Sequence, residues 1–151
     1  MAQQEEENIL EERLIQSVNK AGLFQLLGVQ IERIEGGRGQ VRIAVDERLM
    51  HPQMIVHGGV IFTLADTAMS MALMSVIPPG TPIGTIEAKI NFLAPVRTGE
   101  LIAEATIVHQ GRSTAVLEAT VYNIHESESR AIARTLGTFN IARSKEAAVS
   151  G

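Results

Sequence analysis

The 151-residue sequence contains no cysteine and no tryptophan, and it has only one tyrosine and four phenylalanines. The absence of cysteine excludes disulfide bonds and a cysteine nucleophile, and it fits the reducing environment of the cytoplasm, where we expect this protein. The net charge of −4, without a basic patch, argues against nucleic-acid binding, which usually requires a basic surface. Few aromatic residues and six methionines predict a core of small, adaptable side chains.

Signals for export and for membrane insertion are also lacking. The first residues, MAQQEEENILEERL, are acidic, whereas a secretory signal starts with basic residues followed by an apolar stretch. An apolar run from Val60 to Ile77 approaches membrane-spanning length, but the charged Asp66 and nearby hydroxyl side chains favour a buried helix of a soluble protein. A chain of this length suits one domain, which buries on the order of two thirds of its unfolded surface. We therefore expect a single soluble domain that binds no membrane.

The stretch from His51 to Ile77, HPQMIVHGGVIFTLADTAMSMALMSVI, carries the strongest signal in the chain. From Val60 onward its length exceeds that of an ordinary strand, and it is rich in leucine, alanine and methionine, which favour helices. These features predict a helix from Val60 to Ile77. Because this helix is apolar on nearly every side, we expect it to be buried.

Small and polar side chains recur along the predicted helix. Gly59, Thr63, Asp66, Thr67 and Ser70 are spaced so that they share one narrow stripe. A buried carboxylate is costly unless a partner satisfies it. Asp66 is therefore either a structural acid that pairs with a neighbouring segment or a catalytic carboxylate that handles a proton or a water, and its spacing does not separate the two.

The helix entrance is formed by His57, Gly58 and Gly59. The first backbone N–H groups of a helix have no partner inside it, and they attract negative charge or a polarised carbonyl oxygen. Glycines here can also serve only to permit close packing, and a histidine beside them often only caps the helix. Together with Asp66, the entrance suggests a site at which a carbonyl group is held and attacked.

The remaining segments predict one antiparallel sheet around the central helix. Residues Glu5–Asn19 have the pattern of a surface helix, and Gly22–Gly28 form a short connection. The expected strands are Val29–Glu35 and Gln40–Val45, which flank the turn Gly36-Gly37-Arg38-Gly39, and then Ile83–Leu93, Leu101–Gln110, Ser113–Ile124 and Arg130–Ile141. Gly111-Arg112 is expected to form a two-residue turn.

This order predicts an α+β fold, in which a long central α-helix is wrapped by a curved antiparallel β-sheet, with an extra N-terminal helix. The predicted divisions are an N-terminal helical extension over residues 1–21, the main domain over residues 22–143 and a flexible tail over residues 144–151.

The run HGGVIFTLADTAMSMAL resembles a motif of hotdog-fold acyl-CoA thioesterases of the phenylacetate-degradation (PaaI) type, in which an aspartate lies nine residues after the histidine of His-Gly-Gly. The segment TIEAKINFLAPVRTGEL resembles the next strand of that family, and the similarity covers residues 22 to 141. One departure is His51, since many relatives have an asparagine at this position, six residues before the motif histidine.

The resemblance implies a hotdog fold and a thioesterase that acts on an aromatic or medium-chain acyl-CoA without a cofactor. It also implies homodimers, in which two subunits join their sheets and the active sites lie between them, and often a tetramer of two such dimers.

The resemblance further implies catalytic roles for four residues. Asp66 would be the general base or the nucleophile, and the backbone N–H of Gly58 would hold the thioester oxygen. Thr85 matches a serine or threonine position of the family and would orient the water. His57 would orient the helix entrance or the substrate.

The expected substrate-binding residues are His51, Gly59, Lys89, Asn91, Phe92, Arg97 and Arg112. His51 would replace the family asparagine near the thioester, with a charge that changes near neutral pH. Asn91 and Phe92 would line the acyl channel, although Phe92 also suits the core.

Coenzyme A carries phosphates, so its pocket should offer cations at the rim. The candidates are Lys89, Arg97, Arg112 and Arg134, and Arg97 is favoured because it lies in an exposed turn after a strand. Each of them also suits a solvated surface charge. We expect no metal site, because His51 and His57 lack a neighbouring cysteine or a cluster of acids.

Two other functions remain open at this point. A hotdog-fold dehydratase or hydratase would also act on acyl thioesters, but the catalytic histidine and acid that such enzymes pair in another motif are not found here. A non-catalytic acyl-CoA-binding protein would use the same groove for sensing, and His51 keeps that alternative open.

Overall fold

The structure is a computed structural model that describes residues 1–143, so the predicted tail, residues 144–151, lies outside the described residues. The helices are α1 (Ala2–Asn19), α2 (Gly22–Leu27) and α3 (Gly58–Met74), with a short 3-10 helix η1 (Glu47–Leu49). The strands are β1 (Gln30–Glu35), β2 (Arg38–Ala44), β3 (Ile83–Phe92), β4 (Glu100–Gln110), β5 (Thr114–His125) and β6 (Glu128–Ile141).

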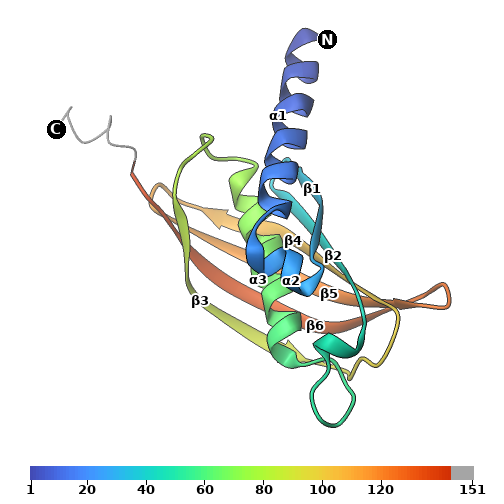
Figure 1. Ribbon diagram of the computed structural model, residues 1–151. Coiled ribbons are helices and arrows are strands. Elements are labelled where there is room, and N and C mark those ends of the chain that lie inside the picture. Colours follow the sequence, from blue (N-terminus) through green and yellow to red (C-terminus); the bar gives the residue numbers. More distant parts are fainter. Residues whose placement is uncertain (144–151) are drawn as a thin grey trace.

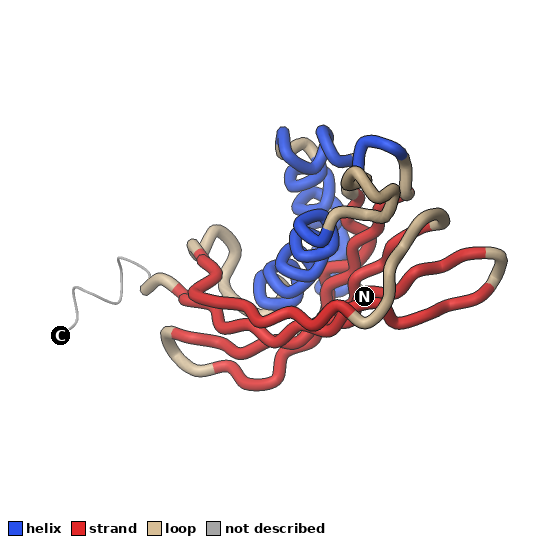
Figure 2. Tube along the Cα trace, turned by 90° about the horizontal axis from the view of Figure 1, so that it is seen from below, coloured by secondary structure: helices blue, strands red, loops and turns tan. Residues whose placement is uncertain are grey.

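The six strands form one antiparallel sheet in the order β1-β2-β4-β5-β6-β3. The long helix α3 lies across one face of this curved sheet, and Figure 2 shows the helices on that side and the strands on the other. The α+β class, with a central helix, a wrapped antiparallel sheet and an N-terminal helix, is confirmed. Among the described residues, no helix combines the length and apolar character needed to cross a bilayer.

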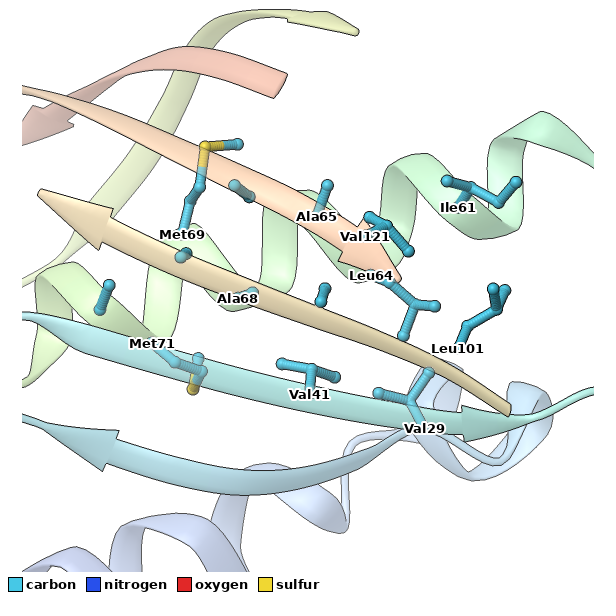
Figure 3. Packing of buried hydrophobic residues seen from close by; sticks show 14 of the residues in the cluster. Val29, Val41, Ile61, Leu64, Ala65, Ala68, Met69, Met71, Leu101 and Val121 are labelled. Atoms are coloured by element: carbon cyan, nitrogen blue, oxygen red, sulfur yellow. The ribbon is translucent and has the colours of Figure 1, made fainter. Parts of the chain in front are cut away.

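The central helix is buried, as its composition predicts. Ten of the 17 residues of α3 are buried, and the helix packs mainly on β2, β4 and β5, the middle of the sheet. Small residues such as Ala65 and Ala68 let the helix approach the strands closely, while Leu64, Met69 and Met71 fill the space beside them (Figure 3).

The helix ends at Met74, three residues before the predicted end at Ile77. Ser75 ends it, because its hydroxyl donates to the carbonyl of Ala72 (2.7 Å) and accepts the N–H of Gly37 (2.7 Å). In addition, Ile77 precedes Pro78, and a residue before proline is disfavoured in the helical conformation. The apolar composition therefore continues past the point at which the backbone can continue as a helix.

The glycine-rich segment between β1 and β2 is a turn, as predicted, but it is shorter than the four residues expected. Gly36 and Gly37 form the turn with positive φ values of 55° and 78°, while Arg38 and Gly39 already belong to β2. A side chain at Gly39 would overlap the carbonyl oxygen of Ala68 and lie 2.7 Å from the backbone nitrogen of Ala72. The lack of a side chain at Gly39 therefore allows β2 to lie in close contact with α3.

The other turns also differ by a residue or two from the predictions. Between β4 and β5 the connection has three residues, Gly111 to Ser113, and the N–H of Gly111 donates to the carbonyl of Thr114. Between β5 and β6, Glu126 and Ser127 both adopt positive φ values, so β6 starts two residues earlier than expected.

The two edges of the sheet differ in how they are covered. At the β1 edge, α1 lies alongside the strand and accepts its outward N–H groups: Asn19 Oδ1 accepts from Ile31 (2.9 Å) and Glu11 Oε1 from Ile34 (3.2 Å). At the other edge, β3 pairs only with β6, and Figure 1 shows it on the opposite side of the molecule from β1. Within the part of the chain that the structure describes, the β3 edge is therefore the one available for pairing.

Candidate active site

The carboxylate of Asp66 lies where α3 passes the β3 edge. Asp66 is half-buried in the middle of the helix, and its Oδ1 accepts a hydrogen bond of 2.7 Å from the hydroxyl of Thr85, near the start of β3. Thr63 and Ser70, one turn away on either side, donate instead to backbone carbonyls of their own helix. Thr85 is thus the hydroxyl that holds the carboxylate.

The predicted polar stripe of α3 is only partly realised. Thr63, Asp66 and Ser70 are half-buried, whereas Thr67 is turned into the core with 6% exposure. Because residues 66 and 67 are adjacent, they lie about 100° apart around the helix, which is wider than the stripe allows.

The entrance of α3 is capped by His57. Its Nδ1 accepts the N–H of Gly59 at 2.9 Å, so the proton of the neutral imidazole is on Nε2. This bond satisfies the N–H of Gly59, while the N–H of Gly58 is in the first turn and has no partner within the helix. Gly58 is therefore the residue of the pair whose N–H is available to a carbonyl oxygen.

Phe92, at the end of β3, lies against this entrance. A side chain at Gly58 would come within 3.0 Å of Phe92 Cζ, so the glycine allows the ring to lie over the helix start. The ring remains 53% exposed. Phe92 thus forms an apolar wall beside the Gly58 N–H.

His51 lies on the loop that leads into α3. Its Nδ1 accepts the N–H of Gln53 at 3.0 Å, the same contact that His57 makes with Gly59. His51 is half-buried, and its loop is closed by a β-bridge between Met50 and Val56. Both histidines of the entrance are therefore held by backbone N–H groups through Nδ1.

Asn91 and Lys89 lie on the opposite face of the sheet from Phe92. Asn91 pairs with the exposed Arg134, whereas Phe92 pairs with the buried Ala133. Since neighbouring side chains of a strand point to opposite faces, Asn91 and Phe92 do not line one channel within a single chain. Lys89 shares the face of Asn91.

The remaining predicted cations lie far apart in the fold. Arg112 is exposed in the turn between β4 and β5, at the end of the sheet that also contains the start of β3. Arg97, in the connection between β3 and β4, donates from Nη1 to the backbone carbonyl of Met54 (3.2 Å) and, at 3.5 Å, to that of Gln53.

The predicted catalytic residues thus form two groups on one chain. Asp66 and Thr85 form the first, and His57 and Gly58 form the second. Asp66 follows Gly58 eight positions later in the helix, a rise of about 12 Å along the axis. This separation along the axis is large compared with the contact of about 3 Å that each group requires.

A sequence profile of the thioesterase superfamily matches residues 53–129, which include both groups. The chain belongs to the thioesterase superfamily. It is 33% identical over 100 residues to 1,4-dihydroxy-2-naphthoyl-CoA hydrolase of Listeria monocytogenes, covering 66% of this chain and 81% of the relative. It is also 33% identical over 98 residues to acyl-coenzyme A thioesterase PaaI of Escherichia coli, covering 64% and 68% of the two chains.

A solved structure of a thioesterase family protein from Silicibacter pomeroyi shares the fold of this thioesterase. The TM-score is 0.79 with 28% sequence identity, and the match covers 85% of this chain and 95% of the other. The resemblance to PaaI-type thioesterases and the hotdog fold are therefore confirmed, and the chain is a thioester hydrolase.

Two features of this thioesterase are not evident from its sequence. The amide of Asn123, on β5, donates to the carbonyls of Thr98 (3.0 Å) and Glu100 (3.1 Å), so a residue of a distant strand fixes the connection that carries Arg97. A surface hollow of about 510 Å³ lies between α1, α2 and β1, and none of the predicted site residues lines it. Neither feature depends on a local motif, so no signal in the sequence could have located it.

Proposed function

We propose that this thioesterase hydrolyses an aromatic or medium-chain acyl-CoA, with Asp66 as the general base or the nucleophile. The relatives support the substrate class, since one is named as a naphthoyl-CoA hydrolase and the other as an acyl-coenzyme A thioesterase. No cofactor is required, because a carboxylate, a water and an oxyanion donor are sufficient for thioester hydrolysis.

The observation that carries the proposal is the hydrogen bond from Thr85 to Asp66 at the β3 edge. This bond engages Oδ1 and leaves Oδ2 to act on the substrate. As a general base, Asp66 takes a proton from water while the water oxygen bonds to the thioester carbon, and the C–S bond then breaks with return of the proton to the thiolate. As a nucleophile, Asp66 bonds to that carbon itself, the thiolate leaves, and water hydrolyses the resulting anhydride.

The oxyanion that forms in either route requires a donor. The N–H of Gly58 suits this role, because it lies at the positive end of α3 and His57 already occupies the neighbouring N–H. A donor of this kind typically contributes about a hundredfold to a thousandfold in rate. His57 then acts by fixing the entrance, and Phe92 borders the acyl group.

The proposal extends to a homodimer that joins two sheets at β3. Because Asp66 and Gly58 of one chain lie too far apart along the helix to serve one carbonyl, each active site would combine Asp66 of one subunit with the helix entrance of the other. The β3 edge next to Thr85 pairs with no strand among residues 1–143, so it offers a surface for this pairing. A tetramer of two such dimers and a cytoplasmic location stay predictions.

Thiol release from phenylacetyl-, hydroxybenzoyl- and medium-chain acyl-CoA tests the proposal. We expect Asp66→Asn to lower kcat by about 10²- to 10⁴-fold, because the amide can neither accept the proton nor attack. Glu118→Gln, on the exposed side of β5, is the matched control and should keep full activity. Full activity of Asp66→Asn would remove Asp66 from the mechanism, and tight binding of every acyl-CoA without release by the natural sequence would favour the binding protein.

A further inference from the structure

The loop that precedes α3 has a backbone conformation that requires support. The N–H of His51 donates to the carbonyl of Ile55 (2.9 Å), and the N–H of Met54 donates to the carbonyl of His51 (2.8 Å). Met54 closes this turn with a φ of 59°, a left-handed conformation that is unfavourable for a residue with a side chain. Contacts from outside the loop must therefore hold it in this shape.

Those contacts come from two consecutive residues of the connection between β3 and β4. The carbonyl of the buried Val96 accepts the N–H of Val56 at 2.9 Å. Next to it, Arg97 donates from Nη1 to the carbonyl of Met54 and, at the limit of hydrogen-bond distance, to that of Gln53. The guanidinium thus binds the residue with the strained backbone directly.

The loop ends at the proposed oxyanion donor. The N–H of His57 donates to the carbonyl of Leu49 (2.8 Å), and Gly58 follows immediately as the first residue of α3. A shift of residues 53–56 would therefore be passed along the chain to the Gly58 N–H. Displacements of about 1 Å at a reacting group can cost up to about a hundredfold in rate.

We propose that Arg97 is a positioning residue, which holds the loop from His51 to His57 and thereby places the N–H of Gly58, and that it is not a ligand of the coenzyme A phosphates. This inference rests on the proposed function for its effect on rate. The geometry favours it because Nη1 donates to two backbone carbonyls, whose partial negative charge complements the guanidinium.

Two substrates with the same acyl group separate positioning from phosphate binding. One is the acyl-CoA, and the other is the acyl thioester of N-acetylcysteamine, which has no phosphate. We expect Arg97→Ala to lower kcat by a similar factor, about 10- to 100-fold, on both substrates. Millimolar guanidinium ion should restore part of the activity of Arg97→Ala, and Arg97→Lys should keep part of it through one carbonyl contact. A loss confined to the acyl-CoA, seen as a raised KM with unchanged kcat, would overturn the proposal.

Amide hydrogen exchange makes the test independent of catalysis. Arg97→Ala should accelerate exchange at Met54, whose N–H donates to His51 within the loop, and at Val56, whose N–H donates to Val96 in the connection between β3 and β4. Exchange in the β4–β5 ladder should not change. The control Arg33→Ala removes an exposed arginine of β1 and should change neither readout. Unchanged exchange in Arg97→Ala would refute the positioning role, whereas accelerated exchange in a protein that cleaves no thioester would refute only the proposed function.

Discussion

At the scale of single residues, the hydroxyl of Thr85 has the most clearly defined role, which is to donate a hydrogen bond to Asp66. It is exposed on an edge strand, where a hydroxyl has no structural need of a partner, yet it donates to Asp66. Thr85→Val keeps the shape of the side chain and removes the donor, whereas Thr85→Ser keeps the donor. Since a hydrogen bond to a charged group contributes about 1.5–3 kcal/mol, we expect kcat to fall roughly 10- to 100-fold in Thr85→Val.

Steady-state kinetics of both variants on the same acyl-CoA would measure this effect. Thr85→Ser should lie within a few-fold of the natural sequence. Equal losses in the two variants would mean that the methyl group of threonine, and not its hydroxyl, is required.

Gly39 is a position at which any side chain would destabilise the fold. An alanine here places its Cβ against the backbone of α3 at Ala68 and Ala72, which no rotamer change relieves. We expect Gly39→Ala to lower the free energy of unfolding by about 1–3 kcal/mol or more, as overpacking does. Chemical denaturation checks this, with Gly22→Ala as the control, because a side chain at Gly22 has no neighbour within 4 Å. Equal stability of the two variants would contradict the close packing of β2 and α3.

The pKa of Asp46 should depend on its hydrogen bonds with Arg48. The side chain of Arg48 donates to both carboxylate oxygens, the shortest contact being 2.6 Å, and these hydrogen bonds, with one from the Arg48 backbone, lower the pKa of Asp46 below its usual value of 3.8. Because the charged form is favoured in the fold, this contribution to stability is present at neutral pH and is lost as the pH falls through the lowered pKa. NMR titration of Arg48→Met should show the pKa of Asp46 returning toward 3.8, whereas Arg33→Met should leave it unchanged.

At the scale of elements, α1 acts as the cover of the β1 edge. Its carboxyl-terminal half packs on the domain through Leu14, Ile15 and Val18, while its amino-terminal half extends beyond the sheet (Figure 1). Its side chains accept the N–H groups of Ile31 and Ile34, which would otherwise be free to pair with another strand.

Hydrogen exchange at the amides of Ile31 and Ile34 tests whether α1 covers the β1 edge. We expect Asn19→Ala to accelerate exchange at Ile31 and Glu11→Ala to accelerate it at Ile34, each by an amount that matches a hydrogen bond of about 0.5–1.5 kcal/mol. Gln16→Ala, elsewhere on α1, should leave both amides unchanged. Protection that persists in both variants would show that the N–H groups have other partners.

The elements themselves were largely predictable, and their ends were not. The composition and length of the run after Val60 are sufficient for a buried helix, and the alternating strands are sufficient for an antiparallel sheet. The end of α3 depends on Ser75 and Gly37, which meet only in the folded chain. Likewise, nothing local marks Gly39 as a packing residue, because the contact that requires a glycine is with a helix about 30 residues away.

At the scale of the whole molecule, the division of the catalytic residues into two groups predicts complementation between subunits. Asp66→Asn removes the acid, and Gly58→Val blocks the entrance by collision with Phe92. Each variant alone should be inactive. A heterodimer of the two, purified through two different affinity tags, contains one intact site of two if the sites lie between subunits, so it should recover about half the natural activity.

Thiol release from the tagged heterodimer is the measurement. An inactive heterodimer would mean that each site lies within one subunit, or that the pairing does not occur at β3. Two copies of Asp66→Asn with different tags serve as the control for the purification.

The candidate site was predictable in its chemistry and not in its arrangement. The residue types and spacing of the His-Gly-Gly motif and Asp66 indicated a helix end and an acid, and the resemblance added Thr85, which the fold brings to Asp66. Sequence reasoning could not assign Arg97, because an arginine in an exposed turn suits a phosphate as well as it suits two backbone carbonyls. The opposite faces of Asn91 and Phe92, in contrast, follow from the alternation of neighbouring side chains along a strand, so sequence reasoning could have separated them.

Because α1 covers the β1 edge, it also limits how many chains can associate through their sheets. A sheet with two uncovered edges can add further chains at both edges and grow into a filament, which is a known hazard of edge strands. Among residues 1–143, each chain leaves one sheet edge, β3, without a partner, and the proposed pairing uses this edge on both partners at once. The joined sheet of such a dimer would end in two β1 edges covered by α1, so growth by edge-to-edge pairing would stop after one step.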